Sequence, residues 1–373
     1  MKKRIISAVL AGAVALSLAA CTGGSGKTAD TQASKAQEQA SSGESAQAEA
    51  SGAEDKMEAG DMAYSFDINN IGEHEFTFSS TAASGSVNEA VILDFCERVN
   101  TLSEGKIKIN HFGGSTLGTE EQNLQALTSG TLDMAMIAVE FYGNSIPQLN
   151  ALLLPYMYED YDQVAKVLQS EAGEYASEQI LKSADVVNLA YFIQAFRNIY
   201  SKKEIKSVDD MSGLKIRVPE SNLYVNTFSM MKAAPTPLPL SEVYTALDTG
   251  VVEAVENIPD TAVHNSWAEV APYMIKTNHM NAPTTMSISN KVFSALNEDE
   301  QNLLREAGYE NFIFSLEATK KADTEARGIL EDSMTMVEPD IESMKSAIDY
   351  TTYEFMGSEE AKTLFDLIQK NIK

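Results

Sequence analysis

Short strand-like segments alternate with helical segments from Glu75 onward, and this alternation restricts the possible folds more than any other feature of the sequence. Period-two apolar spacing is typical of a strand, and apolar residues three to four positions apart are typical of a helix. Segments in this order form βαβ units, which build parallel sheets covered by helices. The expected segments of a first α/β domain with a largely parallel sheet are strands at 76–78, 106–109 and 132–138 and helices at 87–100 and 119–130.

The alternation resumes further along the chain and predicts a second α/β domain. Its expected segments are strands at 186–192, 214–218 and 251–255 and helices from about 221 and over 241–249. A strand at 285–289 would return to the first domain. The helical pattern from 298 to about 330 would be about 50 Å long if unbroken, because an α-helix rises ~1.5 Å per residue, and one helix of that length could lie across both domains.

The N-terminal residues have the form of an export signal. Lys2, Lys3 and Arg4 precede an apolar run over 5–20, which is too short for an easy membrane span of about 20 residues. We therefore expect residues 1–20 to be a cleaved signal peptide. The run ends in Leu-Ala-Ala-Cys, which resembles the bacterial lipobox, so we expect a lipid on Cys21 that anchors the protein to the outer side of the cell membrane. An ordinary signal with a chance cysteine is the alternative.

Residues 21–70 are predicted to be a lipidated cysteine followed by a disordered linker. The segment consists mainly of Ser, Ala, Gly, Gln and Glu and has almost no aromatic residue before Tyr64. Such a composition buries too little apolar surface to offset the entropy lost on ordering. The second cysteine, Cys96, lies among apolar residues at helical spacing, and we expect it to be a buried structural thiol.

The charge and the absent motifs exclude several functions. The formal net charge is −26, and the part from Phe76 onward is itself acidic, which argues against nucleic acid and against a basic membrane-binding face. An anionic ligand would need a few locally placed arginines. Nucleophile-elbow, phosphate-loop and zinc-protease motifs are absent from the sequence, and its four histidines lie far apart. We expect no metal, no cofactor and no enzyme activity.

The most informative stretch is 213–219, Gly-Leu-Lys-Ile-Arg-Val-Pro. In a strand its three apolar residues share one face, while Lys215 and Arg217 share the other. The guanidinium group matches a carboxylate in a planar, two-pronged geometry. Taken alone, the stretch fits an ordinary surface arginine better than a ligand-binding one.

Several sequence blocks resemble the solute receptors of tripartite ATP-independent periplasmic (TRAP) transporters of the DctP type, in the same order along the chain. The blocks are 117–118, 130–134, 154–156, 213–219, 235–237, 241–247, 249–252 and 256–257. The resemblance covers the chain from about Phe76 to the C-terminus. It implies a two-domain, periplasmic-binding-protein-like fold of the class II type, with hinge strands and a long bracing helix. The implied domains are 76–195 with about 284–322, and 196–283 with about 323–373.

The resemblance also implies the ligand-binding residues. The carboxylate-pairing arginine of the family falls on Arg217, a second arginine just past a strand on Arg197, and the amide that completes the cradle on Asn257. Weaker assignments fall on a histidine late in the second domain, on polar and aromatic residues of the first domain, and on two residues beside the strands of the second. These are His279, Thr81, Glu120, Phe141, Glu220 and Leu240. Leu240 replaces a phenylalanine found in many members, so the substrate of a relative does not transfer to this chain.

The function expected from these features is capture of an organic acid, possibly a sugar acid, outside the cytoplasm and its delivery to the small and large membrane subunits of a TRAP transporter. Two alternatives remain at this point: a receptor of an ATP-driven importer, and an extracellular α/β hydrolase. A neighbouring gene pair for membrane subunits would separate the two transporters, and turnover assays would reveal the enzyme.

Overall fold

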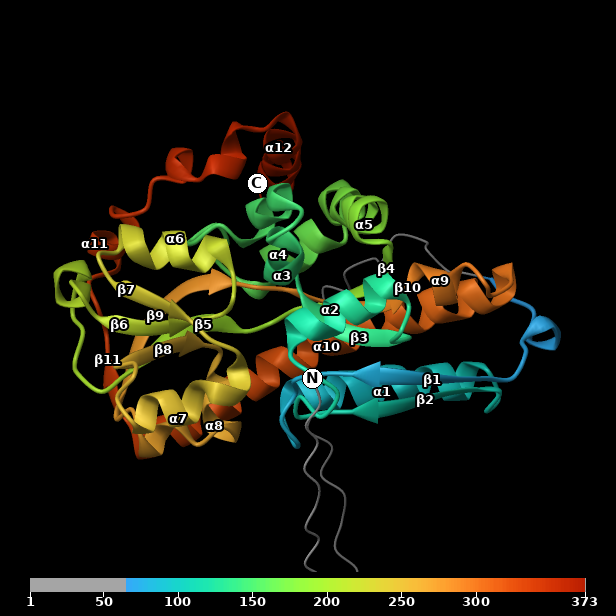
Figure 1. Ribbon diagram of the computed structural model, residues 1–373, viewed down its shortest axis with the longest axis horizontal. Coiled ribbons are helices and arrows are strands. Elements are labelled where there is room, and N and C mark those ends of the chain that lie inside the picture. Colours follow the sequence, from blue (N-terminus) through green and yellow to red (C-terminus); the bar gives the residue numbers. More distant parts are fainter. Residues whose placement is uncertain (1–64, 373) are drawn as a thin grey trace, which may run out of the picture. The chain divides into compact units, whose positions relative to one another are not determined.

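Two β-sheets organise the part of the chain that the computed structural model describes, residues 65–372 (Figure 1). The first sheet has the order β2 (Ile107–Phe112), β1 (His74–Ser79), β3 (Met134–Ala138), β10 (Thr284–Ser289) and β4 (Val186–Phe192). The second has the order β11 (Thr335–Val337), β9 (Tyr273–Asn281), β5 (Phe196–Ser201), β8 (Ala254–Asn257), β6 (Lys215–Val218) and β7 (Ala234–Pro237). The expected signal peptide, Cys21 and most of the linker lie outside the described residues.

Each sheet combines parallel and antiparallel strands, and the prediction of a largely parallel first sheet is only half right. Strand β1 pairs in parallel with β2 and β3, whereas β10 is antiparallel to both β3 and β4. In the second sheet β6 pairs in parallel with β7 and β8, and β5 is antiparallel to β8 and β9. The antiparallel strands enter each sheet from the other one, so the chain crosses between sheets rather than completing one before the next.

Helices cover both sheets and enclose three apolar cores. The helices are α1 (Val87–Leu102), α2 (Glu120–Ser129), α3 (Val139–Gly143), α4 (Tyr161–Leu168), α5 (Glu171–Ala184), α6 (Asn222–Met230), α7 (Val243–Asp248), α8 (Pro259–His264), α9 (Asn290–Phe293), α10 (Glu298–Ser333), α11 (Ile341–Lys345) and α12 (Glu359–Ile372). One core lies around α1 and the first sheet, a second around α7 and α8 beside the second sheet, and the third joins α2 to α6 and α12. Cys96 in α1 is a free, partly buried thiol at the edge of the first of these cores.

Local sequence signals account for the ends of α2. The Thr119 hydroxyl accepts from the backbone N–H of Gln122, and the Gln122 side chain accepts from the backbone N–H of Thr119, so the two residues form a capping box. Gly130 has φ of 71° and ends the helix in the left-handed region, which glycine adopts without the steric cost of a Cβ. These caps place the first turn of α2 at the edge of the first sheet.

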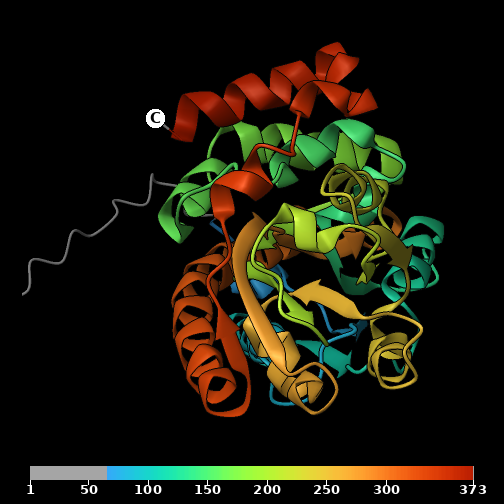
Figure 2. The same cartoon turned by 90° about the vertical axis from the view of Figure 1, so that its left-hand side faces the viewer.

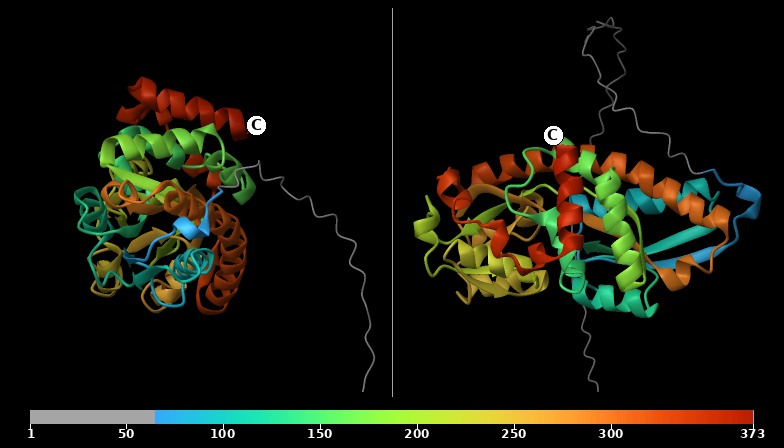
Figure 3. Two further views of the ribbon diagram at one scale, coloured as in Figure 1. Left: turned by 90° about the vertical axis from the view of Figure 1, so that its right-hand side faces the viewer. Right: turned by 90° about the horizontal axis from the view of Figure 1, so that it is seen from above.

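Three connections join the two sheets. The chain passes from β4 to β5 through 193–195 and returns from β9 to β10 through 282–283. Helix α10 is the third connection: it has 36 residues and contacts α1 and β4 at one end and α8 at the other. Figures 2 and 3 show this helix running past both sheets. Helix α12, at the top of Figure 2, packs on α4 and α5. The long helix expected from the sequence is therefore confirmed. Within residues 65–372, none of the helices combines the length and the apolar character that a membrane crossing needs.

Candidate functional site

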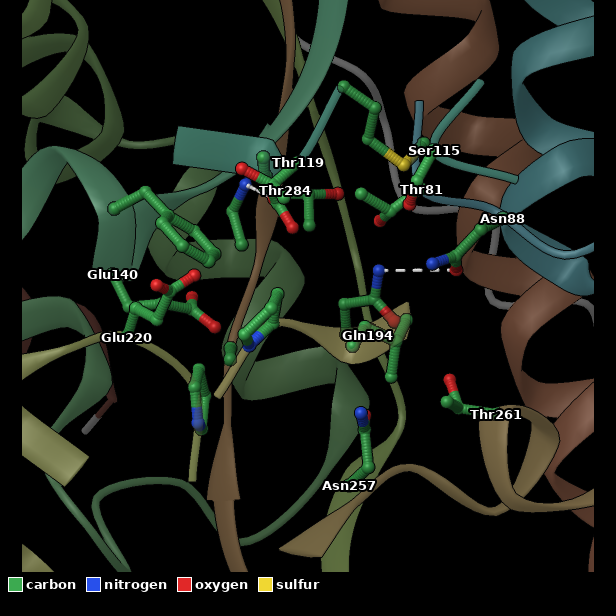
Figure 4. A pocket seen from close by; sticks show the side chains of 18 of the residues that line it. Thr81, Asn88, Ser115, Thr119, Glu140, Gln194, Glu220, Asn257, Thr261 and Thr284 are labelled. Carbon is green, nitrogen blue, oxygen red and sulfur yellow. Dashed lines mark hydrogen bonds between the residues drawn. The ribbon is translucent and has the colours of Figure 1, made fainter. Parts of the chain in front are cut away.

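A pocket lies between the two sheets, at the edge where the parallel strands end (Figure 4). Loops that follow β1, β2, β6 and β7 contribute to it, together with helix α3, which begins directly after β3, and the last residue of β8. This is where open α/β sheets generally place ligands, because the carboxyl ends of parallel strands share one edge. The space between the side chains, including the part open to solvent, is about 800 Å³. Eight of the nine predicted ligand-binding residues line it: Thr81, Glu120, Phe141, Arg197, Arg217, Glu220, Leu240 and Asn257.

Arg217 is buried in this pocket without an acidic partner in the described part of the chain. Its side chain is 3% exposed, and its Nε and Nη2 donate to the Leu238 carbonyl oxygen at 2.9 and 2.5 Å. Since this carbonyl takes one side of the guanidinium, Nη1 and one N–H of Nη2 stay available at its end. Burial lowers the pKa of Arg217 to about 10, which still leaves the group charged at neutral pH.

Arg197, by contrast, is neutralised within the protein. Its Nε and Nη2 donate to the two carboxylate oxygens of Glu256 at 2.5 and 2.8 Å, and both residues are buried. Burial alone would raise the pKa of Glu256, but the charge and hydrogen bonds of Arg197 hold it at about 2. The structure corrects one detail of the prediction, because Arg197 lies within β5 rather than just past a strand.

His279 is the predicted residue that does not line the pocket. It is 1% exposed in β9, and its ring nitrogens contact the Thr277 hydroxyl at 2.8 Å and Glu256 at 3.3 Å. Burial lowers the pKa of His279 and favours the neutral ring. The residue therefore stands behind the pocket wall, where it supports Glu256, and its position offers no direct contact with a ligand.

The remaining predicted residues present complementary groups to the cavity. The Asn257 side-chain oxygen accepts from the Ile258 backbone N–H at 2.8 Å, which leaves the amide nitrogen free to donate. Phe141 is buried in α3 and Leu240 begins the turn before α7, so both supply apolar wall. Thr81 follows β1 and Glu220 follows β6. Together these residues suit a ligand that has one anionic group and a polar body.

Two neighbouring carboxyl groups in the pocket favour the protonated state. Glu120, at the start of α2, accepts from the Ala138 backbone N–H at 2.5 Å, and Glu140 lies in the first turn of α3. Burial, with repulsion from Glu140, raises the pKa of Glu120 to about 8. Burial also raises the pKa of Glu140 to about 7, although Arg197 opposes that rise. The pocket can therefore exchange protons near neutral pH.

Sequence reasoning missed several residues of the pocket. They are Asn88, Ser115, Thr119, Met136, Ala138, Glu140, Gln194, Pro219, Pro239, Ser241, Thr261, Ala282 and Thr284. Gln194 and Ala282 lie in the two crossovers, so their position depends on how the sheets are joined. Glu140 lies two residues after β3, an apolar strand whose end was correctly predicted, and a charged residue in that position is a signal that could have identified it.

Replacing Glu140 by Gln should make the ligand-free protein more resistant to unfolding at alkaline pH. Between about pH 4.5 and 7 the native protein holds a proton on Glu140 that the unfolded chain releases, so the native state of the wild type loses stability as the pH rises. A glutamine does not titrate. The free energy of unfolding, measured with urea, should therefore shift in favour of Glu140→Gln as the pH rises. Between pH 5 and pH 8 the difference from the wild type should grow by about 1 to 3 kcal/mol.

The matched control for this change is Glu97→Gln on the exposed face of α1. This variant should track the wild type at both pH values. The difference in free energy of unfolding between Glu140→Gln and the wild type should grow as the pH rises. A difference that stays constant or shrinks would contradict a proton held on Glu140 in the native state.

The fold and the pocket define a class of protein. The protein has two mixed sheets joined by crossing strands, and the pocket between the sheets contains a buried arginine. This is the architecture of a two-domain solute-binding protein. The comparisons with known proteins give the same class. The family model described as bacterial extracellular solute-binding protein, family 7 (DctP) matches residues 78–358.

Individual relatives extend this similarity over most of the chain. A solute-binding protein of Roseobacter denitrificans is 32% identical over 254 residues, which cover 68% of this chain and 78% of the relative. A crystal structure of a TRAP periplasmic solute-binding protein from the same species, with bound L-galactonate, has 27% identity and a TM-score of 0.74 over 81% of this chain and 100% of that one. A Bradyrhizobium TRAP protein in complex with galacturonate has 29% identity and a TM-score of 0.76 over 79% and 99%. The chain belongs to family 7 of the bacterial extracellular solute-binding proteins.

Proposed function

We propose that this protein captures a small organic acid outside the cytoplasm and delivers it to the small and large membrane subunits of a TRAP transporter. The observation that carries the proposal is Arg217, a buried guanidinium that lines the pocket without an acidic partner among residues 65–372. A buried charge is costly unless it is paired. A ligand carboxylate supplies that pair and can accept from both ends of the planar group. The family match favours the TRAP transporter over the ATP-driven importer.

Sugar acids are the ligand class that the pocket suits best. The relatives described above bind L-galactonate and galacturonate, which are acids with a hydroxyl-rich body. Beyond the arginines, hydroxyl and amide side chains supply much of the wall of this pocket, and such groups fix the orientation of a polyhydroxylated ligand. The polar residues of this kind are Thr81, Asn88, Ser115, Thr119, Gln194, Ser241, Asn257, Thr261 and Thr284.

Binding is proposed to be coupled to closure of two domains, 76–195 with about 284–322 and 196–283 with about 323–373. The hinge would lie in the crossovers at 193–195 and 282–283 and in α10. Two hydrogen bonds join the proposed domains. Asn144 donates to the Glu220 carbonyl at 2.7 Å, and Asp260 accepts from the backbone N–H of Val87 at 3.1 Å. These contacts would form on closure and shield the ligand from water.

The protein is proposed to act as a receptor that releases its ligand unchanged. In the described residues, the groups that line the pocket serve recognition: two arginines, amides, hydroxyls and carboxyl groups. Incubation with a bound sugar acid, followed by mass spectrometry, should return the same acid. Appearance of a modified product would contradict this part of the proposal.

An acid ligand should raise the melting temperature of the purified protein. A ligand that binds only the folded state stabilises it by RT ln(1 + [L]/Kd), about 2.7 kcal/mol at a hundredfold excess over Kd. A thermal-shift screen would compare aldonic and uronic acids with the corresponding neutral alditols, which lack only the carboxylate. At least one acid should raise the melting temperature by several degrees. Stabilisation by neutral sugars or metal ions alone would remove the support for an organic-acid receptor.

Attachment to the membrane is proposed to depend on a lipid on Cys21. Cys21→Ser should release the protein from the membrane fraction and leave its ligand affinity unchanged, because the residues that line the pocket begin at Thr81. Cell fractionation and a thermal-shift titration of the released protein check both parts. A cleaved Cys21→Ser protein that remains in the membrane fraction would show that the anchor is a different one.

A further inference from the structure

Glu140 and Thr284 are the two pocket residues with a buried side-chain oxygen that lacks a hydrogen-bond partner in the described part of the chain, and of the two only Glu140 can carry a charge. Its side chain is 3% exposed and lines the pocket, and its Oε2 has no hydrogen-bond partner among residues 65–372. Leaving a buried acceptor unsatisfied typically costs about 1 to 3 kcal/mol, and more when the group is charged. Figure 4 shows Glu140 together with Glu220 on one side of the pocket. A ligand in this pocket is in a position to supply the missing partner.

The charges around Glu140 limit what that ligand can carry. Among the described residues that line the pocket, Arg197 and Arg217 are the only cations, and Glu256 already neutralises Arg197. Arg217 is thus left for one ligand carboxylate. A second carboxylate on the ligand would find no free cation and would meet the carboxyl groups of Glu120, Glu140 and Glu220 instead. Like charges placed together in a buried site repel strongly, which is a common means of rejecting a wrong partner.

We propose that Glu140 is a specificity-determining residue, which hydrogen-bonds a ligand hydroxyl and rejects a second carboxylate, so that this receptor selects polyhydroxylated monocarboxylates over dicarboxylates. The inference rests on the proposed function and names the ligand class more narrowly. A hydroxyl can donate to an ionised Glu140 or accept from a protonated one. A carboxylate only accepts hydrogen bonds, so it can pair with Glu140 only when that residue keeps its proton.

Rejection of a dicarboxylate should therefore be stronger at higher pH. Because burial raises the pKa of Glu140 to about 7, its carboxyl group loses its proton near neutral pH. The strand and turn packed against α3, β3 and 147–153, carry no titratable side chain. The titratable groups that face Glu140 from the surrounding elements are Glu120 on α2, Tyr224 on α6, Arg197 on β5, Arg217 on β6, Glu256 on β8 and Glu220 in the loop after β6.

Pairs of C6 acids that differ at one end provide the test. Galactonate and gluconate end in a CH₂OH group, whereas galactarate and glucarate carry a second carboxylate there. Calorimetric titration at pH 8.5 would compare the wild type, Glu140→Gln and the surface control Glu97→Gln. The comparison uses the pair whose aldonate binds the wild type more tightly. In that pair, the wild type and Glu97→Gln should bind the aldonate at least about tenfold more tightly than the dicarboxylate. Glu140→Gln should reduce that preference by at least about fivefold.

Two results would separate the inference from the function on which it rests. If no acid binds the wild type, the proposed function itself fails. If acids bind but the wild type accepts the dicarboxylate equally well, or Glu140→Gln leaves the preference unchanged, only the role of Glu140 is overturned. Titrations of the wild type at pH 5.5 and 8.5 provide a test that needs no variant: the aldonate preference should be smaller at pH 5.5, and a preference independent of pH would overturn the inference.

Discussion

Replacing Arg217 by Ala is expected to abolish most of the affinity for the acid while the protein stays folded. Truncating one partner of a buried, hydrogen-bonded charge pair costs about 2 to 5 kcal/mol, which corresponds to a loss of roughly thirtyfold to several thousandfold. The ligand carboxylate would then lie in the pocket without the cation that Leu238 holds in place. Calorimetric titration measures the loss, and melting curves confirm that the variant is folded.

Two further variants distinguish a specific contact from a general attraction. Arg217→Lys keeps the charge but loses the planar pair of donors, so it should also bind poorly. Lys215→Ala removes an exposed charge two residues away on the same strand and should leave the affinity nearly unchanged. A folded Arg217→Ala protein that binds within threefold of the wild type would show that the carboxylate lies elsewhere, with Arg197 the next candidate.

The second large effect concerns stability and involves Glu256. Glu256→Gln removes the charge that neutralises Arg197 and leaves a guanidinium that is 6% exposed without its ion pair. Breaking a buried pair by removing one partner typically costs about 3 to 5 kcal/mol, because an uncompensated buried charge remains. Urea unfolding of the ligand-free protein should therefore show a correspondingly lower free energy of unfolding.

A nearby pair offers a matched control for this loss. Glu253 and Lys203 are 3.5 Å apart, but their side chains are 40% and 47% exposed. Glu253→Gln should cost less than about 1 kcal/mol, since exposed ion pairs contribute little. Equal losses for Glu253→Gln and Glu256→Gln would mean that burial of the Arg197 pair does not determine its contribution.

The elements with clean apolar periodicity were predicted closely from the sequence. Strand β4 has the expected bounds but lies in the first sheet, not in the second domain where it was expected, and β10, α1 and α10 begin within one residue of their expected starts. These segments carry their own signal, because one face or the whole strand is buried in an apolar core. Strand β8 was placed about three residues too early, and Val251, expected as its first residue, is instead largely exposed.

The strands that were missed have polar or proline-rich sequences that tertiary contacts stabilise. In β5, Arg197 and Asn198 are buried because Glu256 of β8 and the backbone of Asn278 in β9 pair with them. Strand β7 contains Pro235 and Pro237, which suit an edge strand that pairs on one side only. None of these partners is adjacent in the sequence, so the local pattern could not reveal them.

The residues of the binding site also differ in whether the local sequence could reveal them. Arg217 could be identified because it interrupts an apolar strand before a proline, and the family resemblance then directed attention to Arg197 and Asn257. Thr284 gave no such signal, and the place of Glu140 after a buried strand gave only a weak one, because the importance of both residues depends on which residues face them across the pocket. Both have a buried side-chain oxygen without a hydrogen-bond partner among the described residues, a property that only the folded chain reveals.

A crystal structure of the complex with the acid that stabilises the protein most tests the central claim directly. The account predicts that the two oxygens of the ligand carboxylate lie about 2.7 to 2.9 Å from Nη1 and Nη2 of Arg217, while the Leu238 carbonyl keeps its hydrogen bond to Nε. The rest of the ligand should extend toward Asn257 and Glu140. A carboxylate bound outside this pocket, or paired with another residue while Arg217 contacts only Leu238, would contradict it.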